Sequence, residues 1–492
     1  MRVPYCAIAV IFFILLSCEN QQKKDERVAK QYCASCHAFP DPSLLDKKTW
    51  EKSVLPEMAF RMGIDASKLS TIPIDDQDAI ISALVTSKIS QQQWDAIKRY
   101  YAENSPDSIY ASNPEIKETI KQFALIPFEL PRRSFGLTTL IATDTLHHKI
   151  YVGTRNAKLY EFNNEFVLQD SFRLSSAPSQ LLIRENDNPL ILAMGVMDPS
   201  EQAKGELFQF IPKDQTVPPI IDSLQRPVYF ECADLNNDKA DDYVICAFGD
   251  YTGALFAFQA LGNGKFKKHT LINVSGARRV IIKDFDNNGL NDILALMAQG
   301  DERVVMLYNQ GNFQFRIANL LRFSPVNGSS YFDIADFNND GKFDILYTNG
   351  NNSDYSPILK PYHGIHIFLN NGSNDFKESW FHPMHGASQA RVNDFDKDGD
   401  LDIAAISFFP DFRNAEQGFI YFENTPQGFK AQTTQIAATG RWLVMEMSDF
   451  DTDGDNDIIL GALNFSTGVP DSVNQFWKKQ KHSLLLLRNK LH

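Results

Sequence analysis

The segment ARVNDFDKDGDLDIAAI, residues 390–406, places an acidic stretch between two short apolar runs. Similar acidic stretches occur four more times, as DLNNDKADD (234–242), DFDNNGLND (284–292), DFNNDGKFD (336–344) and DFDTDGDND (449–457). Successive stretches begin 50 to 58 residues apart. Self-similarity at this period indicates a propeller or a related array, with a solenoid as the alternative architecture.

Strand signals favour the propeller. Most repeat units contain four short strand patterns, as a propeller blade does, and seven inner strands are expected to begin near residues 135, 179, 228, 277, 329, 387 and 440. The last unit has only three strands, while FALIPFEL (123–130) precedes the first unit as a spare strand. Pairing the two would close the ring and remove exposed edges. We therefore predict an all-β seven-bladed propeller over residues 122–492.

The acidic stretches predict calcium sites. They follow the pattern D-x-[DN]-x-[DN]-G-x-x-D, with Lys239 in place of glycine in the first stretch. Side chains at positions one, three and five converge on a centre, and a carbonyl at seven and a carboxylate at nine complete an oxygen cage suited to Ca²⁺. Up to five ions are expected. The predicted side-chain ligands are Asp234, Asn236, Asp238 and Asp242; Asp284, Asp286, Asn288 and Asp292; Asp336, Asn338, Asp340 and Asp344; Asp394, Asp396, Asp398 and Asp402; and Asp449, Asp451, Asp453 and Asp457.

These loops resemble the FG-GAP/VCBS repeats of integrin-like propellers, a resemblance that implies calcium-carrying blades over residues 228–460. The alternative interpretation is acidic turns that favour Asn, Asp and Gly for their backbone geometry. The formal charge of −13 argues against a nucleic-acid partner.

A second cluster lies near the N-terminus, in QYCASCHAF (31–39). Cys33, Cys36 and His37 form C-x-x-C-H, the attachment pattern of covalent c-type haem. A thioredoxin motif would follow a strand, and a zinc site would need two more ligands. With a helix expected over residues 90–103, the segment 27–104 resembles a small all-α cytochrome c domain. His37 is expected on one face of the iron and Met58 on the other, with Met62 or an open position as alternatives.

The first 18 residues read as an export signal. Their end, Leu15-Leu16-Ser17-Cys18, resembles a bacterial lipobox, which implies lipidation of Cys18 and anchoring at the periplasmic face or the outer membrane. An ordinary cleaved signal is the alternative. Residues 19–26 are expected to be a flexible tether and residues 105–121 a linker.

Further candidate residues lie in the propeller region. The predicted loops between second and third strands are long and aromatic, and their candidate ligand contacts are Tyr355, Tyr362, His363, Phe409, Arg413 and Trp477. Arg278, Arg391, Arg441 and Trp442 are expected near strand starts that face the central channel. Cys232 and Cys246 are expected to be core thiols, with a cross-strand disulfide as the alternative, and the predicted hairpin places Cys232 opposite Val244.

Two functions follow from these patterns. The first is a membrane-anchored haem electron-transfer protein whose propeller docks a partner or a ligand. The second is an oxidoreductase whose propeller binds substrate or a quinone cofactor and passes electrons to the haem. Adhesion or carbohydrate binding is a weaker alternative. The sequence names neither a redox partner nor a small-molecule substrate, and it leaves open whether the protein is an enzyme.

Overall fold

The chain divides into two compact units in the computed structural model, which describes residues 20–84, 89–112, 114–131, 136–185, 187–212, 218–351 and 357–491. One unit comprises Met1–Lys68 with Leu84–Ile109, and the other Leu69–Ala83 with Tyr110–His492. The predicted export signal, Cys18 and Tyr355 lie outside the described residues. Among the described helices, none is long and apolar enough to cross a membrane.

The first unit is helical. Its elements are α1 (Gln21–Cys33), η1 (Pro42–Leu44), α2 (Lys47–Thr49), the π-helical turn η2 (Trp50–Val54), α3 (Leu55–Arg61) and α5 (Gln91–Asn104), with η3 (Ser67–Thr71) spanning the boundary to the second unit. The prediction of a helix near residues 90–103 is confirmed by α5. Ser90 and Gln93 form a capping box at its start, which satisfies amides that the first turn leaves open.

The core of this unit is aromatic. Trp50 and Tyr101 pack with ring centroids 4.4 Å apart. The Trp50 indole donates to the Pro42 carbonyl and the Tyr101 hydroxyl to the Pro40 carbonyl, each at 2.8 Å. Each ring thus buries apolar area while its polar atom keeps a partner.

Helix α1 begins earlier than the sequence indicates. Residues 21–26, which we expected in a flexible tether, form its first turns, and the Asn20 side chain accepts a hydrogen bond from the Gln22 amide. Asp25 is 2% exposed and receives bonds of 2.9 and 3.0 Å from Arg99 of α5. This bidentate ion pair holds the start of α1 against α5, which a polar composition alone does not reveal.

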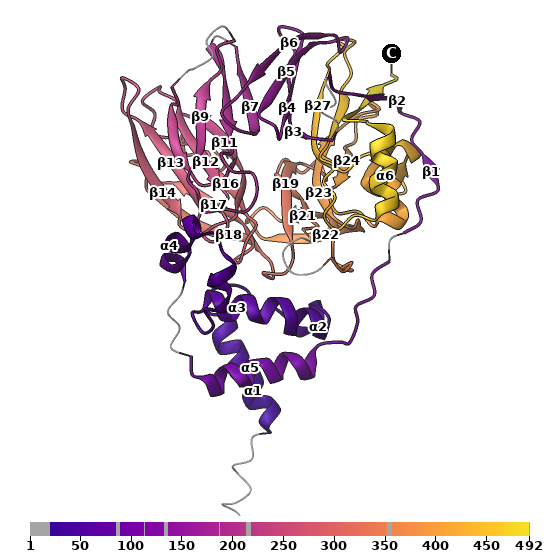
Figure 1. The fold of residues 1–492 in the computed structure, drawn as a ribbon. Helices are drawn as coiled ribbons and strands as arrows, with labels where there is room; N and C mark the ends of the chain where they lie inside the picture. The colour runs from indigo at the N-terminus through magenta and orange to yellow at the C-terminus, as the bar shows by residue number, and fades with distance from the viewer. Residues whose placement is uncertain are drawn as a thin grey trace, which may run out of the picture. The chain divides into compact units, whose positions relative to one another are not determined.

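The second unit is a β-propeller, as predicted. Within the described residues its strands form seven sheets that follow one another around a ring (Figure 1), and the solenoid alternative is wrong. Blade 1 contains β3 (Thr138–Asp144), β4 (Lys149–Thr154), β5 (Lys158–Asn163) and β6 (Leu168–Arg173); blade 2, β7 (Pro178–Arg184), β8 (Asp187–Ala193), β9 (Gly205–Gln209) and β10 (Ile221–Leu224); blade 3, β11 (Pro227–Ala233), β12 (Asp242–Ala247), β13 (Ala254–Ala260) and β14 (Phe266–Ile272); blade 4, β15 (Ala277–Lys283), β16 (Asp292–Met297), β17 (Arg303–Asn309) and β18 (Phe315–Arg322). Blade 5 contains β19 (Ser329–Ala335), β20 (Asp344–Asn349), β21 (Gly364–Asn370) and β22 (Phe376–Pro383); blade 6, β23 (Ala387–Asn393), β24 (Asp402–Ser407), β25 (Phe419–Glu423) and β26 (Lys430–Thr433); blade 7, β27 (Trp442–Ser448), β28 (Asp457–Ala462), β29 (Leu484–Asn489) and β2 (Phe123–Phe128).

The second strand of each of blades 3 to 7 is buried along its whole length. Both faces of such a strand pack against neighbouring blades, so the residues after its first aspartate are mostly apolar and do not alternate with polar ones. One such core joins Ile406 and Phe419 of blade 6 to Trp442 and Leu460 of blade 7. Apolar burial between blades therefore holds the ring together.

The spare N-terminal strand closes the ring. β2 pairs antiparallel with β29, from Phe123 opposite Asn489 to Phe128 opposite Leu484. In Figure 1 the purple β2 lies beside the yellow C-terminal strands. The predicted closure is confirmed.

Among the described elements of the second unit, those not predicted are β1 (Glu118–Thr119), α4 (Ile74–Ala83), α6 (Asp471–Gln480) and the 3-10 helices η5 (Phe412–Gly418) and η6 (Gln435–Thr439). β1 lies inside the expected linker and pairs in parallel with β26. α6 occupies what we expected to be a loop, and the Trp477 indole on it donates to the Ala438 carbonyl at 2.9 Å. α4 belongs to this unit because Asp76 accepts a 3.1 Å bond from the Glu201 amide.

Replacing Phe123 by alanine should destabilise the propeller by about 3–5 kcal/mol, the usual cost of truncating a buried phenylalanine. Phe123 is 1% exposed and makes edge contacts with Phe395 and Tyr421, each at 5.4 Å between ring centroids. Denaturant unfolding at fixed calcium measures the loss. Ile126→Ala, on the same strand but 38% exposed, is the control and should cost far less. Equal losses in the two variants would contradict this role of β2.

Candidate functional site

The five acidic stretches occupy equivalent places in blades 3 to 7. Each connects the first strand of its blade to the second, and its ninth residue is the first residue of that second strand. Strands therefore flank every acidic stretch. Together these five stretches are called the acidic loops below, with positions numbered one to nine.

The aspartate at position one organises each loop internally. In the loop of blade 5, Asp336 accepts from the amides of Asp340 at 3.0 Å and Gly341 at 2.7 Å. In blade 4, Asp284 accepts from the amides of Asn288 at 3.1 Å and Gly289 at 2.8 Å. The curled backbone of the loop turns its amides toward this carboxylate.

The aspartate at position nine fastens the loop to the rest of the blade. All five of these side chains are fully buried: Asp242, Asp292, Asp344, Asp402 and Asp457. One oxygen of each accepts from the amide that follows the third strand or ends it, at 2.7 or 2.8 Å. In blades 3 to 6 the other oxygen accepts from the amide at position two, at 2.9 to 3.1 Å. We call this arrangement the carboxylate clamp.

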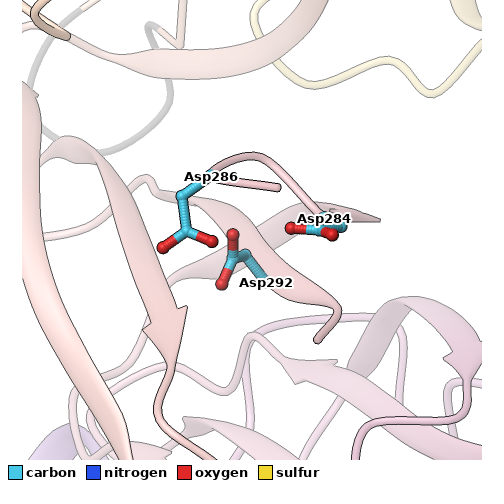
Figure 2. Close-up of side chains that lie close together, drawn as sticks. All are labelled: Asp284, Asp286 and Asp292. Carbon is cyan, nitrogen blue, oxygen red and sulfur yellow. The ribbon is translucent and has the colours of Figure 1, made fainter. Parts of the chain in front are cut away.

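Carboxylates converge in three of the acidic loops. Figure 2 shows the carboxylates of Asp284, Asp286 and Asp292 turned toward a common space. One oxygen from each of these residues lies within 4.8 Å of the others, and the same holds for Asp394, Asp396 and Asp402 and for Asp449, Asp451 and Asp453. Like charges at such distances repel unless a cation lies between them, so these groups have the geometry of metal ligands.

The loops of blades 3 and 5 are less open to a cation. In blade 5 the Lys342 ammonium lies 2.8 Å from Asp340, where it competes with a metal for that carboxylate. In blade 3 the Asn236 amide donates to Asp238 at 2.9 Å.

The backbones of the five acidic loops nevertheless share one conformation: position six has a positive φ in every loop, including Lys239 at 70°. Position four also has a positive φ, which the sequence analysis did not anticipate, and Asn fills it in three loops, as its tolerance of this region favours.

Burial makes the clamp carboxylates weak acids. It raises the pKa of Asp402 to about 6 and that of Asp457 to about 7. Nearby acidic residues of the same loops act in the same direction. A bound divalent cation would reverse the effect, because an opposite charge favours the ionised carboxylate.

The cysteine cluster lies at the end of α1. Cys33 is the last residue of the helix and half-buried, Cys36 is exposed in the turn that follows, and both are free thiols. Burial raises the pKa of Cys33 to about 11, so this thiol is protonated at neutral pH. His37 is half-buried, and its Nδ1 lies 2.9 Å from the Ala38 carbonyl oxygen. Met58 lies within α3 and Met62 directly after it, both half-buried, and their ranking as iron ligands stays a prediction.

Several candidate ligand contacts are instead structural. Arg441, expected near the channel, is 1% exposed. Its guanidinium lies over the Phe408, Phe409 and Phe465 rings and donates to the Phe408 carbonyl at 2.6 Å. Burial without a carboxylate partner lowers its pKa to about 10.

Other aromatic candidates are also directed into the fold. Trp442 is fully buried and donates to the Ala437 carbonyl at 2.8 Å, and Trp477 is 2% exposed. Tyr362 donates to the Val326 carbonyl at 3.1 Å, and His363 is fully buried. Arg413 remains exposed, held by Asp411 at 2.8 Å. Aromatic content in a loop did not distinguish packing from binding.

The first strands carry a charged network that the sequence analysis only partly identified. Arg391 lies 3.3 Å and Arg279 3.8 Å from Asp333, and Glu231 accepts from the Ile282 amide at 2.9 Å. Arg279 lies over the rings of Tyr229 and Tyr331. In the sequence, the pattern that could have revealed this network is an ionisable residue at the fifth position of the first strand. It occurs in four blades, as Glu231, Asp333, Arg391 and Glu446.

Cys232 and Cys246 are free thiols, and the disulfide alternative is wrong. The register also differs from the expectation, because Cys232 faces Tyr243 and Cys246 faces Tyr229. The hairpin is centred between Asn237 and Asp238 rather than on Asp238, which explains the one-residue difference. Cys246 is fully buried and belongs to the core, as predicted.

Comparison with known proteins supports the repeat. Residues 284–347 match the family described as FG-GAP-like repeat. No match was found among curated proteins. Solved structures that resemble the chain include the Pan2 WD40 domain of Neurospora crassa, with 12% identity, a TM-score of 0.44 and coverage of 76% of this chain and 97% of that one. Sqt1 of Saccharomyces cerevisiae has 8% identity and a TM-score of 0.44, covering 76% of this chain and 99% of that one. A third is the Dos1 propeller, with 10% identity, a TM-score of 0.43 and coverage of 72% and 80%.

The chain thus contains a seven-bladed β-propeller with an FG-GAP-like repeat. A propeller of this kind suggests docking of a ligand or a partner.

Two variants of the blade 4 loop separate the clamp from metal binding. Asp292→Asn should lower stability in EDTA by about 1–3 kcal/mol, because it deprives buried backbone amides of a charged acceptor, and it should also reduce the gain on adding calcium, because Asp292 is one of the three converging carboxylates. Asp286→Asn should leave stability in EDTA nearly unchanged and reduce only the gain on adding calcium. Thermal unfolding in EDTA and in calcium measures both. A gain on adding calcium that is the same in Asp286→Asn as in the wild type would contradict the metal assignment of this loop.

Proposed function

We propose that this chain is a membrane-anchored c-type haem electron-transfer protein whose calcium-stabilised propeller docks a redox partner or a ligand. The observation that carries the proposal is the grouping of two free thiols and an imidazole at the end of α1, in a helical unit distinct from the propeller. The protein is exported in this proposal, with Cys18 carrying the lipid that anchors it to the bacterial cell envelope.

The residues present fit a covalent haem. Cys33 and Cys36 are three residues apart across one turn, and neither thiol is engaged in a disulfide. Each thiol would add across one vinyl group of the porphyrin, with sulfur bonding to one carbon and hydrogen to the other. The adjacent His37 would supply an axial nitrogen, and Met58 is the proposed opposite ligand. When bound, the haem supplies one-electron redox chemistry. The chain would hold the haem covalently, and the thioether of the half-buried Cys33 would be shielded from solvent at the end of α1.

The acidic loops are proposed to hold up to five calcium ions. Oxygen ligands from aspartate and asparagine suit this hard cation. The net charge of −13 also favours cation binding by the folded chain. The ions would hold the loops in the conformation that the carboxylate clamp already specifies. Stabilisation by a ligand at one hundred times its Kd is about 2.7 kcal/mol per site.

An oxidoreductase is the second candidate, favoured by the charged network of the first strands. Arg279, Asp333 and Arg391 bring both signs of charge together, as a site for a polar substrate would require. The two functions differ in what reduces the haem. Reduction on adding sugars or alcohols, with or without a quinone cofactor, would favour the oxidoreductase, whereas reduction only by small redox proteins favours electron transfer.

Covalent haem attachment tests the proposal directly. The purified protein, expressed with haem-attachment machinery, should retain its pigment in acid acetone, and a Cys33→Ser, Cys36→Ser double variant should lose it completely. Cys232→Ser removes a thiol of the propeller and should retain full pigment, so it controls for the loss of a cysteine. Pigment extracted from the wild-type protein by acid acetone, or retained by the double variant, would contradict the proposal.

The axial ligands can be tested on the same preparation. Met58→Ala should abolish the far-red charge-transfer band of the oxidised protein while leaving the thioether bonds intact. An unchanged band would assign the position to another residue, with Met62→Ala as the next variant.

A further inference from the structure

The acidic loop of blade 7 has a carboxylate that the ligand pattern does not use. Its residues are Asp449, Asp451, Asp453, Asp455 and Asp457, so an acid stands at position seven as well as at the four expected positions. In the loops of blades 3, 4 and 5 this position is Ala240, Leu290 and Lys342. The pattern assigns only the backbone carbonyl of position seven to the ion.

Unpartnered carboxylate oxygens are concentrated in this loop. Asp455 is 2% exposed and neither of its oxygens has a hydrogen-bond partner. Oδ2 of the fully buried Asp457 and Oδ1 of Asp451 also lack one. Within the described part of the chain, the acidic loops of blades 3, 4 and 5 contain no buried carboxylate oxygen of this kind. Burying such an atom without a partner is unfavourable.

The carboxylate clamp differs here too. In blades 3 to 6 the position-nine aspartate accepts from the amide at position two. In blade 7 the corresponding atom, Oδ2 of Asp457, is free of hydrogen bonds. An oxygen that elsewhere fastens the loop is thus left available to a cation.

Local cations do not balance the loop. Arg488 Nε lies 2.9 Å from Asp451 Oδ2, and the Lys397 ammonium donates to the Gly454 carbonyl at 3.0 Å. Five carboxylates therefore face two cationic side chains. Asp453 and Asp455 are neighbours across the turn, with Asp453 Oδ1 accepting the Asp455 amide at 3.2 Å. The carboxylates outnumber the cationic side chains around them, and a divalent cation would reduce that negative excess.

We propose that the acidic loop of blade 7 binds the tightest cation of the ring and that the Asp455 carboxylate is one of its ligands, an inference that rests on the proposed calcium loops. The ligand is a hard divalent cation, Ca²⁺ in the first instance. More carboxylates and a higher site charge raise calcium affinity. The loop of blade 6 carries Asp400 at the same position, half-buried and with one unpartnered oxygen, and ranks second.

The position of this site links it to closure of the ring. The Asn489 amide at the end of β29 donates to Asp457 Oδ1 at 2.7 Å. The Asn489 side chain donates to the Phe395 carbonyl at 2.8 Å and accepts from Gln122, just before β2, at 2.7 Å. A cation in this loop would therefore brace the junction at which the two ends of the propeller meet.

Calcium titration of the metal-stripped, full-length protein tests the proposal. Asp455→Asn should weaken the tightest calcium site by at least tenfold. Asp241→Asn removes the same charge from position eight of the blade 3 loop, where the side chain is exposed and outside the ligand set, and should leave the tightest site unchanged. A tightest site that is equally strong in Asp455→Asn and wild type overturns the assignment of Asp455 while the other calcium loops stand. A wild-type protein that binds no calcium overturns both.

Hydrogen exchange of the wild-type protein provides a second measurement that needs no variant. With one equivalent of Ca²⁺, protection should rise first in residues 449–457 and in β29 and β2. Protection that rises first in the loop of blade 3, 4 or 5 would overturn the proposed order.

Discussion

The acidic loops of blades 3 to 7 depend on one repeated interaction, the carboxylate clamp. In blades 3 to 7 a buried aspartate at the start of the second strand accepts one amide from the end of the third strand, and in blades 3 to 6 it also accepts one from the acidic loop. A charged acceptor in a low-dielectric interior makes such bonds strong and makes their loss costly. Because the clamp fixes where each loop leaves and re-enters its blade, it also helps to place the carboxylates that converge, at positions one, three and nine in blades 4 and 6 and at positions one, three and five in blade 7.

Much of the propeller follows from its sequence because repetition averages out local ambiguity. Five copies of one acidic pattern indicated the order of the strands in blades 3 to 7. The spare strand at residues 123–130 predicted the pairing of β2 with β29, which the structure confirms. The missed elements depend on single tertiary contacts. The first turns of α1 are held by Asp25 and Arg99, α4 by Asp76 and Glu201, and α6 by Trp477. No periodicity marks such contacts in advance.

The acidic loops could likewise be predicted from the sequence, but the contacts of their side chains could not. The ligand spacing identified the acidic loops, but it could not reveal that Lys342 competes for Asp340 or that Asp455 is buried without a partner. For Arg441 the sequence indicated a ligand contact, because the residue lies near a strand start. In the structure its guanidinium instead lies over three phenylalanine rings. For the cysteine cluster, the motif specifies the chemistry, and the structure places one free thiol on the last residue of α1 and the other in the turn that follows.

The claim that the acidic loops are cation sites built on the carboxylate clamp is tested most directly by a crystal structure grown in calcium, with anomalous scattering recorded at long wavelength. The account predicts anomalous peaks enclosed by the loop carboxylates, with the strongest in the loop of blade 7. Clamps that are intact around loops without any anomalous peak would contradict it.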